Sequence, residues 1–142
     1  MMKSNGTGKF DLELFFNALA DRTRLRLINL MGDTEVCVCF FVEVLGTNQP
    51  KISRHLAYLK KAGLVTTRRQ GNWMHYRLAE IKNEDAAQIL RDVRERLLAN
   101  DSEMQADRSR LVEVCCAPVL PESVQGAPLP AALGNVKCRP QC

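Results

Sequence analysis

Six cysteines are the residues with the most distinctive chemistry in this 142-residue chain. Cys37 and Cys39 are separated by one valine, Cys115 and Cys116 are adjacent, and Cys138 is followed by Cys142 after three residues. Thiolates are soft ligands that select thiophilic ions over oxygen-loving ones. We expect these cysteines to be reduced ligands or redox thiols rather than disulfides, because no secretion signal precedes them and stable disulfides are rare in the cytoplasm.

The first pair falls in a segment, 35–45, that is predicted to be a short helix. Residues two apart stand about 200° from each other around a regular helix, because each residue turns it by about 100°. One ion could therefore bind both sulfurs only if that end of the helix unwinds. The pair lies about ten residues before a second predicted helix, so ion capture would distort the element that leads into it.

Zinc fits this set of residues poorly. The chain has only two histidines, His55 and His75, and neither cysteine pair has the two-residue spacing usual in zinc sites. A four-sulfur zinc site built from two pairs stays open, and cadmium or lead is the closer rival for a soft ion.

A second functional signal is a run of positive charge. From Gln49 to Arg77 the sequence contains seven Lys or Arg and no Asp or Glu. This stretch carries +7 and the whole chain +4, so the remainder sums to −3. A basic segment on an otherwise slightly acidic protein is the electrostatic pattern of a phosphate-binding face.

The pattern of apolar and turn residues predicts a mainly α-helical domain with one β-hairpin. Helices are expected at 11–20, 21–31, 35–45, 48–63, 84–99 and 102–114, and strands at 64–69 and 73–78, around a Gly71–Asn72 turn. A hairpin that follows a pair of helices is typical of a winged helix-turn-helix. We expect residues 1–9 to form a flexible arm, 10–116 the domain, and 117–142 a flexible tail that holds five of the six prolines.

The helix that begins near Asn48 has the composition of a DNA-reading helix. Ile52, Leu56 and Leu59 form its apolar stripe, and polar residues occupy the opposite face. Gln pairs well with adenine and Arg with guanine in the major groove, while a basic hairpin suits phosphate or minor-groove contact. The expected contacts to double-stranded DNA are Gln49, Lys51, Ser53, Arg54, His55, Tyr58 and Lys61 on the helix, and Arg68, Arg69, Asn72 and, by its place in the hairpin, His75.

Three stretches resemble the ArsR/SmtB family of metal-sensing repressors. They are LADRTRLRLI at 19–28, QPKISRHLAYLKKAGLV at 49–65 and RQGNWMHYRL at 69–78, and the likeness covers roughly residues 10–100. The resemblance implies a homodimer built from the first and last core helices, binding of the ion-free protein to an inverted repeat, and release on ligand binding. Two apolar stripes suit such a dimer: Leu12, Phe15, Phe16 and Leu19, and Ala86, Leu90, Val93 and Leu97.

Within the family, Cys37-Val38-Cys39 resembles the core of the motif of arsenic-operon repressors. Those repressors usually carry an Asp and then a third Cys after this core, and here the positions are Phe40 and Val42. Trivalent arsenic takes three sulfurs, so either the site here is two-coordinate or the third thiolate comes from elsewhere in the chain. Cys115 and Cys116 resemble the C-terminal cysteine pairs of other arsenic and methylarsenite repressors, and Cys138 and Cys142 are possible additional ligands.

The sequence therefore favours a cytoplasmic repressor whose effector is As(III), or the related Sb(III) or methylarsenite, with no organic cofactor. A repressor of the same fold that senses cadmium, lead or thiol oxidation is the alternative. A small thiol enzyme is disfavoured, because a catalytic thiolate needs a cationic pocket or a helix N-terminus and the neighbours of Cys37 are apolar. No apolar run approaches the ~20 residues of a membrane span.

Overall fold

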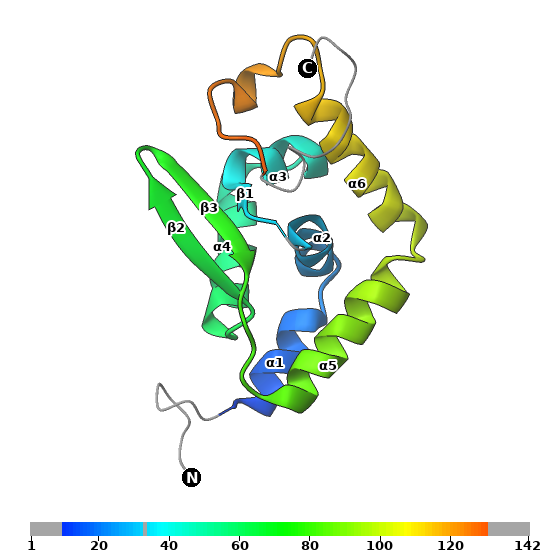
Figure 1. Cartoon of the computed structure of the whole chain (residues 1–142). Coiled ribbons are helices and arrows are strands. Elements are labelled where there is room, and N and C mark those ends of the chain that lie inside the picture. The colour runs from blue at the N-terminus through cyan, green and yellow to red at the C-terminus, as the bar shows by residue number, and fades with distance from the viewer. Residues whose placement is uncertain (1–9, 33, 131–142) are drawn as a thin grey trace.

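The computed structural model describes residues 10–32 and 34–130, and Figure 1 shows their arrangement. The elements are, in order, α1 (Leu12–Leu19), α2 (Arg22–Met31), β1 (Val36–Cys37), α3 (Val38–Leu45), α4 (Gln49–Lys61), β2 (Val65–Gln70), β3 (Trp73–Leu78), α5 (Glu84–Asp92), the π-helical turn η1 (Val93–Leu98), α6 (Ser102–Cys115) and the 3-10 turn η2 (Glu122–Val124). The predicted fold class, a mainly helical winged helix-turn-helix, is confirmed.

Short polar side chains fix where the helices begin. Asp21, Asn48 and Asn83 each accept a hydrogen bond from the backbone N–H three residues later, which satisfies one of the unpaired donors of a first helical turn. Helix α6 begins at Ser102 as expected, and Asp101 caps it by accepting the bond from the Met104 N–H. The start of each helix is thus set locally by the sequence.

The sheet has three antiparallel strands in the order β1-β3-β2. The predicted hairpin is confirmed, with Val65 opposite Leu78 and Gln70 opposite Trp73. Strand β1 was not predicted, since two residues are too few to show an alternating pattern. It places Val36 opposite Tyr76 and Cys37 opposite His75, and so joins the helical core to the wing.

The core lies between the helices of the helix-turn-helix and α2. Phe40 and Phe41 of α3 and Leu56 of α4 are fully buried. The tight connection from α3 to α4 passes through Gly46, whose φ of 69° is left-handed and favours glycine. This packing fixes α4 against α3, with the polar face of α4 turned outward.

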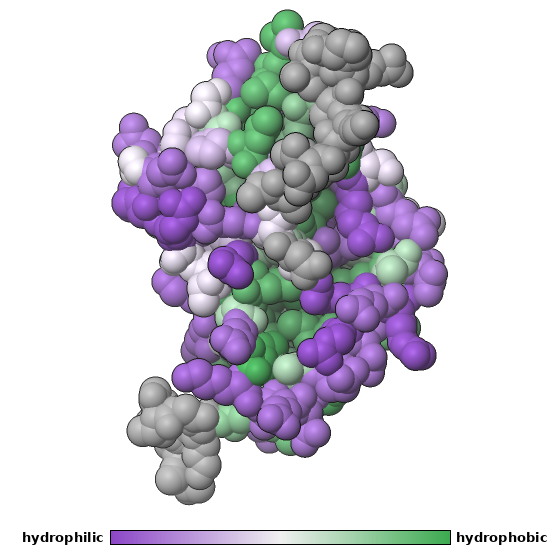
Figure 2. All heavy atoms as spheres, in the orientation of Figure 1, coloured by the Kyte–Doolittle hydropathy of each residue, from purple (hydrophilic) through white to green (hydrophobic). Residues whose placement is uncertain are grey.

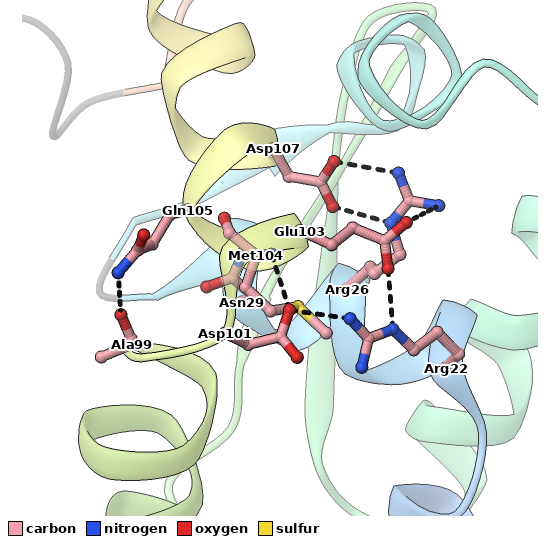
Figure 3. Close-up of polar contacts among 9 residues, drawn as sticks. All are labelled: Arg22, Arg26, Asn29, Ala99, Asp101, Glu103, Met104, Gln105 and Asp107. Atoms are coloured by element: carbon pink, nitrogen blue, oxygen red, sulfur yellow. Dashed lines mark hydrogen bonds and ion pairs between the residues drawn. The ribbon is translucent and has the colours of Figure 1, made fainter.

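Helix α6 packs along α2 through a row of ion pairs (Figure 3). The Arg22 guanidinium contacts Asp101 and Glu103 at 2.7 Å each, and Arg26 donates two bonds to the buried Asp107 at 2.7 and 2.9 Å. The buried Asn29 amide donates to the Met104 carbonyl at 2.9 Å. Matched charges therefore hold the C-terminal helix in place.

The proline-rich segment differs from the expected flexible tail as far as residue 130. Val124, Ala127 and Pro130 are buried, and η2 contacts α3 (Figure 1). The Ser123 hydroxyl donates to Glu43 of α3 at 2.5 Å. Apolar residues among the prolines give this segment something to bury, and proline lowers the entropy lost on ordering. Residues 1–9 and the cysteines at 138 and 142 lie outside the described residues.

Part of each predicted dimer stripe stays on the surface. Phe15, Ala86 and Leu90 are buried in the core, whereas Leu12, Phe16 and Leu97 are 56%, 47% and 68% exposed. Figure 2 shows apolar surface along the middle of one face, with hydrophilic residues on both sides. In the ranges that the structure describes, no helix is long and apolar enough to cross a membrane.

The ion pairs of α6 give a stability prediction. We expect Asp107→Ala to lower the free energy of unfolding by about 2 kcal/mol, because it leaves the half-buried Arg26 guanidinium without its bidentate partner. The measurement is the urea midpoint by circular dichroism. Arg110→Ala is the control: it removes an exposed 3.5 Å pair with Glu43 and should cost about 0.5 kcal/mol or less. Equal losses in the two variants would contradict the prediction.

Candidate nucleic-acid interface and cysteine site

Helix α4 has the two-faced character expected of a reading helix. Ile52, Leu56 and Leu59 are fully buried against the core. The opposite face is exposed to solvent and carries Gln49, Lys51, Arg54 and Lys61. Asn48 caps the helix by accepting from the Lys51 N–H at 2.9 Å. The N-terminal half of α4 can therefore approach base edges without any rearrangement of the core.

The other residues of α4 that were expected to contact DNA are less exposed. Ser53, His55 and Tyr58 are half-buried. His55 Nδ1 lies 3.3 Å from Arg24 Nη1 of α2 and 3.8 Å from an Asp21 oxygen. The Arg24 guanidinium stacks 4.3 Å from the centre of the Tyr58 ring. His55 and Tyr58 therefore contact α2, which sequence periodicity alone did not reveal.

On the wing, Arg69 and Asn72 are exposed, and neither has an ion pair or side-chain hydrogen bond with the residues described. Arg68 is also exposed but binds both oxygens of Glu35, with a shortest distance of 2.7 Å, and this guanidinium lowers the pKa of the Glu35 carboxyl. His75 is buried and pairs with the Gln70 side chain at 3.0 Å. His75 is therefore too little exposed in this conformation for the expected DNA contact.

The first cysteine pair has a geometry that the sequence did not predict. Helix α3 begins at Val38, not near Glu35, and Cys37 caps it with an extended backbone, φ −72° and ψ 144°. The two sulfurs consequently lie on the same side, with Sγ atoms 3.4 Å apart. The expected 200° separation assumed that both residues were helical. Because Cys37 belongs to β1, the pair can share one ion without any unwinding.

Hydrogen bonds at this corner stabilise one thiolate. The Cys39 thiol donates to Cys37 Sγ, and backbone N–H groups of Cys39, Val38 and Met74 donate to the same sulfur. Together they outweigh burial and lower the pKa of Cys37 from 9.0 to about 6. The pKa of Cys39 is raised, because its proton is held by the Cys37 thiolate and its thiol is half-buried. At neutral pH the site is an ionised sulfur beside a protonated one.

A third sulfur is not already in place. Among residues 10–32 and 34–130, no three His, Cys, Asp or Glu side chains are grouped so that they could hold a metal ion. Cys115 is buried near the end of α6, and the half-buried Cys116 follows it. The four expected ligands in the described residues, Cys37, Cys39, Cys115 and Cys116, are not gathered into one cluster.

Comparison with known proteins gives this arrangement a context. A family profile described as "Bacterial regulatory protein, arsR family" matches residues 21–67. The Arsenical resistance operon repressor of Escherichia coli is 47% identical over 76 residues, 53% of this chain and 65% of that protein. The Arsenic resistance transcriptional regulator ArsR1 of Pseudomonas putida is 39% identical, over 71% of this chain and 77% of that protein. The chain belongs to the ArsR family.

Solved structures agree with this ArsR-family assignment. HlyU of Vibrio cholerae has a TM-score of 0.52 and 29% identity, and the match covers 61% of this chain and 91% of that one. The homodimeric winged helix-turn-helix DNA-binding domain Mb0332 of Mycobacterium bovis has a TM-score of 0.53 and 31% identity, over 63% of this chain and 78% of that one. The cysteine pair at 37 and 39 and the whole of α4 lie within the segment that the family profile matches, whereas α6 and η2 lie beyond it.

The short sulfur contact predicts an unusual titration. In a variant that keeps only Cys37 and Cys39, thiolate absorbance in the ultraviolet should rise as the pH rises through about 6, because the ionised Cys37 is held by four hydrogen bonds. Replacing Cys39 by Ala in that background removes the strongest of them, so the midpoint should move toward the ordinary 9.0. A phosphine reductant keeps the thiols reduced. A midpoint near 9.0 in the two-cysteine protein would contradict the geometry.

Proposed function

We propose that this ArsR-family protein is a repressor that binds operator DNA as a homodimer in its ion-free form and releases it when Cys37 and Cys39 bind As(III), or Sb(III) or methylarsenite. The observation that carries the proposal is the pair of sulfurs 3.4 Å apart at the N-terminal end of α3, the helix that leads directly into α4. The names of the E. coli and P. putida relatives, both linked to arsenic resistance, support the choice of ion.

The DNA-binding half of the proposal rests on α4 and the wing. Gln49 and Arg54 are exposed on the N-terminal half of α4, where a reading helix meets base edges. Lys51, Lys61 and Arg69 are exposed and suit phosphates. Arg68 is partly neutralised by Glu35, so its contribution is weaker than the sequence suggested.

The ion-binding half rests on the chemistry of the donors. Two sulfurs, one of them already ionised, are a soft donor set suited to a thiophilic ion. When bound, such an ion supplies a Lewis-acidic centre that shares electron density with both sulfurs. Cys37 would then accept the N–H bonds of Val38 and Met74 less strongly, which loosens the start of α3 and its junction with β3. The start of α3 and strand β3 both adjoin the DNA-binding surface. We therefore expect this loosening to release the operator.

The third sulfur is expected from the C-terminal part of the chain. Helix α6 contacts α3, and Cys115 ends that helix. Cys116, Cys138 and Cys142 are the other candidates. We favour a site that is centred on the first pair and completed by one of these sulfurs.

A repressor that responds to thiol oxidation is the second candidate, and the close approach of the ionised Cys37 sulfur to Cys39, 3.4 Å apart, favours it. Sensing of cadmium or lead uses the same soft donors and is a variant of the leading proposal. Arsenite added under reducing conditions separates the first two functions, since sulfur–arsenic charge-transfer absorbance should appear for an ion sensor and not for a purely redox switch.

The homodimer is supported by the apolar residues that α1 and the α5–η1 region leave exposed. Leu12, Phe16 and Leu97 form no part of the buried core and are each about half exposed or more. In Figure 1, α1 and α5 lie at the same end of the molecule. The homodimeric M. bovis domain shares this fold. A second copy would cover these side chains and place two copies of α4 along one duplex.

DNA reading can be tested with two cationic residues of α4. Arg54→Ala should reduce the preference for operator over random DNA by about 1–3 kcal/mol, because it removes a base contact. Lys61→Ala should weaken binding to operator and to random DNA alike, and should lower the slope of log affinity against log salt by about one. Fluorescence anisotropy at several salt concentrations measures both effects. An unchanged preference in Arg54→Ala would show that α4 does not read bases at this position.

Ion release can be tested with two paired substitutions. Cys37→Ser with Cys39→Ser should bind operator normally and ignore arsenite. Cys115→Ser with Cys116→Ser separates the cases: a lost response means a shared site, and a retained one means that the first pair acts without them. Coupling must be reciprocal, so DNA should weaken arsenite binding by the factor by which arsenite weakens DNA binding, typically about 1–3 kcal/mol. A protein without all four of these cysteines that still leaves DNA on adding arsenite would end the proposal.

A further inference from the structure

Arg24 connects three helices through one side chain. Its Nε and Nη2 donate to the carbonyls of Ala18 and Asn17, in the last turn of α1, at 3.0 and 2.8 Å. A cation bound to terminal carbonyls at the negative end of a helix dipole is favourable. The Arg24 side chain therefore caps the C-terminal end of α1, while the Arg24 backbone lies in the first turn of α2.

The remaining groups of Arg24 contact α4. Nη1 lies 3.3 Å from His55 Nδ1, and the guanidinium carbon lies 4.3 Å from the centre of the Tyr58 ring. His55 and Tyr58 are three residues apart on α4 and so lie on one side of it. Burial lowers the pKa of His55 despite the opposing charge of Asp21, and the charges of Arg24, Lys51 and Arg54 lower it further, so its ring is neutral and can accept the bond.

We propose that Arg24 is a positioning residue for DNA binding: through His55 and Tyr58 it sets the orientation of α4 relative to α1, and it does not itself contact DNA. The inference rests on the proposed function, since α4 is taken as the reading helix and α1 as part of the dimer interface. The orientation between them then fixes how the two copies of α4 are spaced along the duplex.

Lysine cannot replace Arg24 in this role. A planar guanidinium donates in several directions in its own plane while its face stacks on an aromatic ring, whereas an ammonium group offers a single charged point. Arg22, two residues earlier on the same helix, is the matched control, because its guanidinium bonds to Asp101 and Glu103 of α6 and not to α4.

The test compares Arg24→Lys and Arg24→Gln with Arg22→Gln at several salt concentrations. We expect the Arg24 variants to bind operator about tenfold more weakly with an unchanged salt slope, and Arg22→Gln to stay within about twofold of wild type. A slope reduced by about one in Arg24→Gln would overturn the proposal, since it would make Arg24 a phosphate contact. Unchanged affinity in both Arg24 variants would overturn it as well.

A second pair of variants keeps the proposal testable if Arg24 substitutions disturb folding. Tyr58→Phe retains the ring under the guanidinium and should lose much less operator affinity than Tyr58→Leu. Tyr58→Leu should lose about as much affinity as Arg24→Gln, and the double variant should lose little more, because one contact is removed twice. Loss of affinity in Tyr58→Phe alone would mean that the hydroxyl contacts DNA, and would overturn the assignment.

A measurement without DNA separates this inference from the proposed function. The pKa of His55, followed by NMR, should rise in Arg24→Gln, because a positive charge beside the ring is lost, and should stay unchanged in Arg22→Gln. An unchanged His55 pKa in Arg24→Gln would overturn the positioning contact whatever the DNA result. A wild-type chain that binds no DNA while His55 responds as expected would overturn the proposed function and leave the contact standing.

Discussion

The extended backbone at Cys37 is the constraint on which the cysteine site depends. One residue serves as the end of β1, the cap of α3 and the acceptor of four hydrogen bonds. If Cys37 were the first helical residue, its sulfur would point away from Cys39 and neither the short contact nor the low pKa would exist. The pairing of Cys37 with His75 also brings the Met74 N–H to the sulfur. The wing and the start of α3 therefore both donate hydrogen bonds to Cys37 Sγ.

Positive charge in the acid-free stretch is divided between structure and surface. Arg68 is engaged by Glu35, whereas Lys51, Arg54, Lys61 and Arg69 face solvent. Arg24 lies outside that stretch, on α2, and its guanidinium contacts Tyr58 of α4. Counting charge along the sequence therefore overstated how many of these cations are exposed without a partner carboxylate. An arginine that binds carbonyls or a carboxylate has little left with which to attract a phosphate.

Local signals explain why most of the fold was predictable. Asp21, Asn48 and Asn83 cap helices where the sequence placed them, and Gly71 with Asn72 forms the expected turn. The features that the sequence did not predict depend on contacts between residues far apart in the chain. Strand β1 exists only because β3 lies beside it, and the burial of His75 and the tilt of Tyr58 toward α2 depend on partners many residues away. The cysteines could be identified by type and spacing, but their 3.4 Å contact required the tertiary pairing of Val36 and Cys37.

The C-terminal segment packs against the helix that follows Cys37. Helix α3 contacts α6 and η2, and its Glu43 accepts from Ser123 at 2.5 Å and pairs with Arg110 at 3.5 Å. The same helix also contacts α4 and β3. Any displacement of α3 must therefore disturb its contacts with α4, with the wing and with the C-terminal elements together. Because α6 and η2 lie beyond the segment that the family profile matches, that segment alone does not contain all the contacts that hold α3 in place.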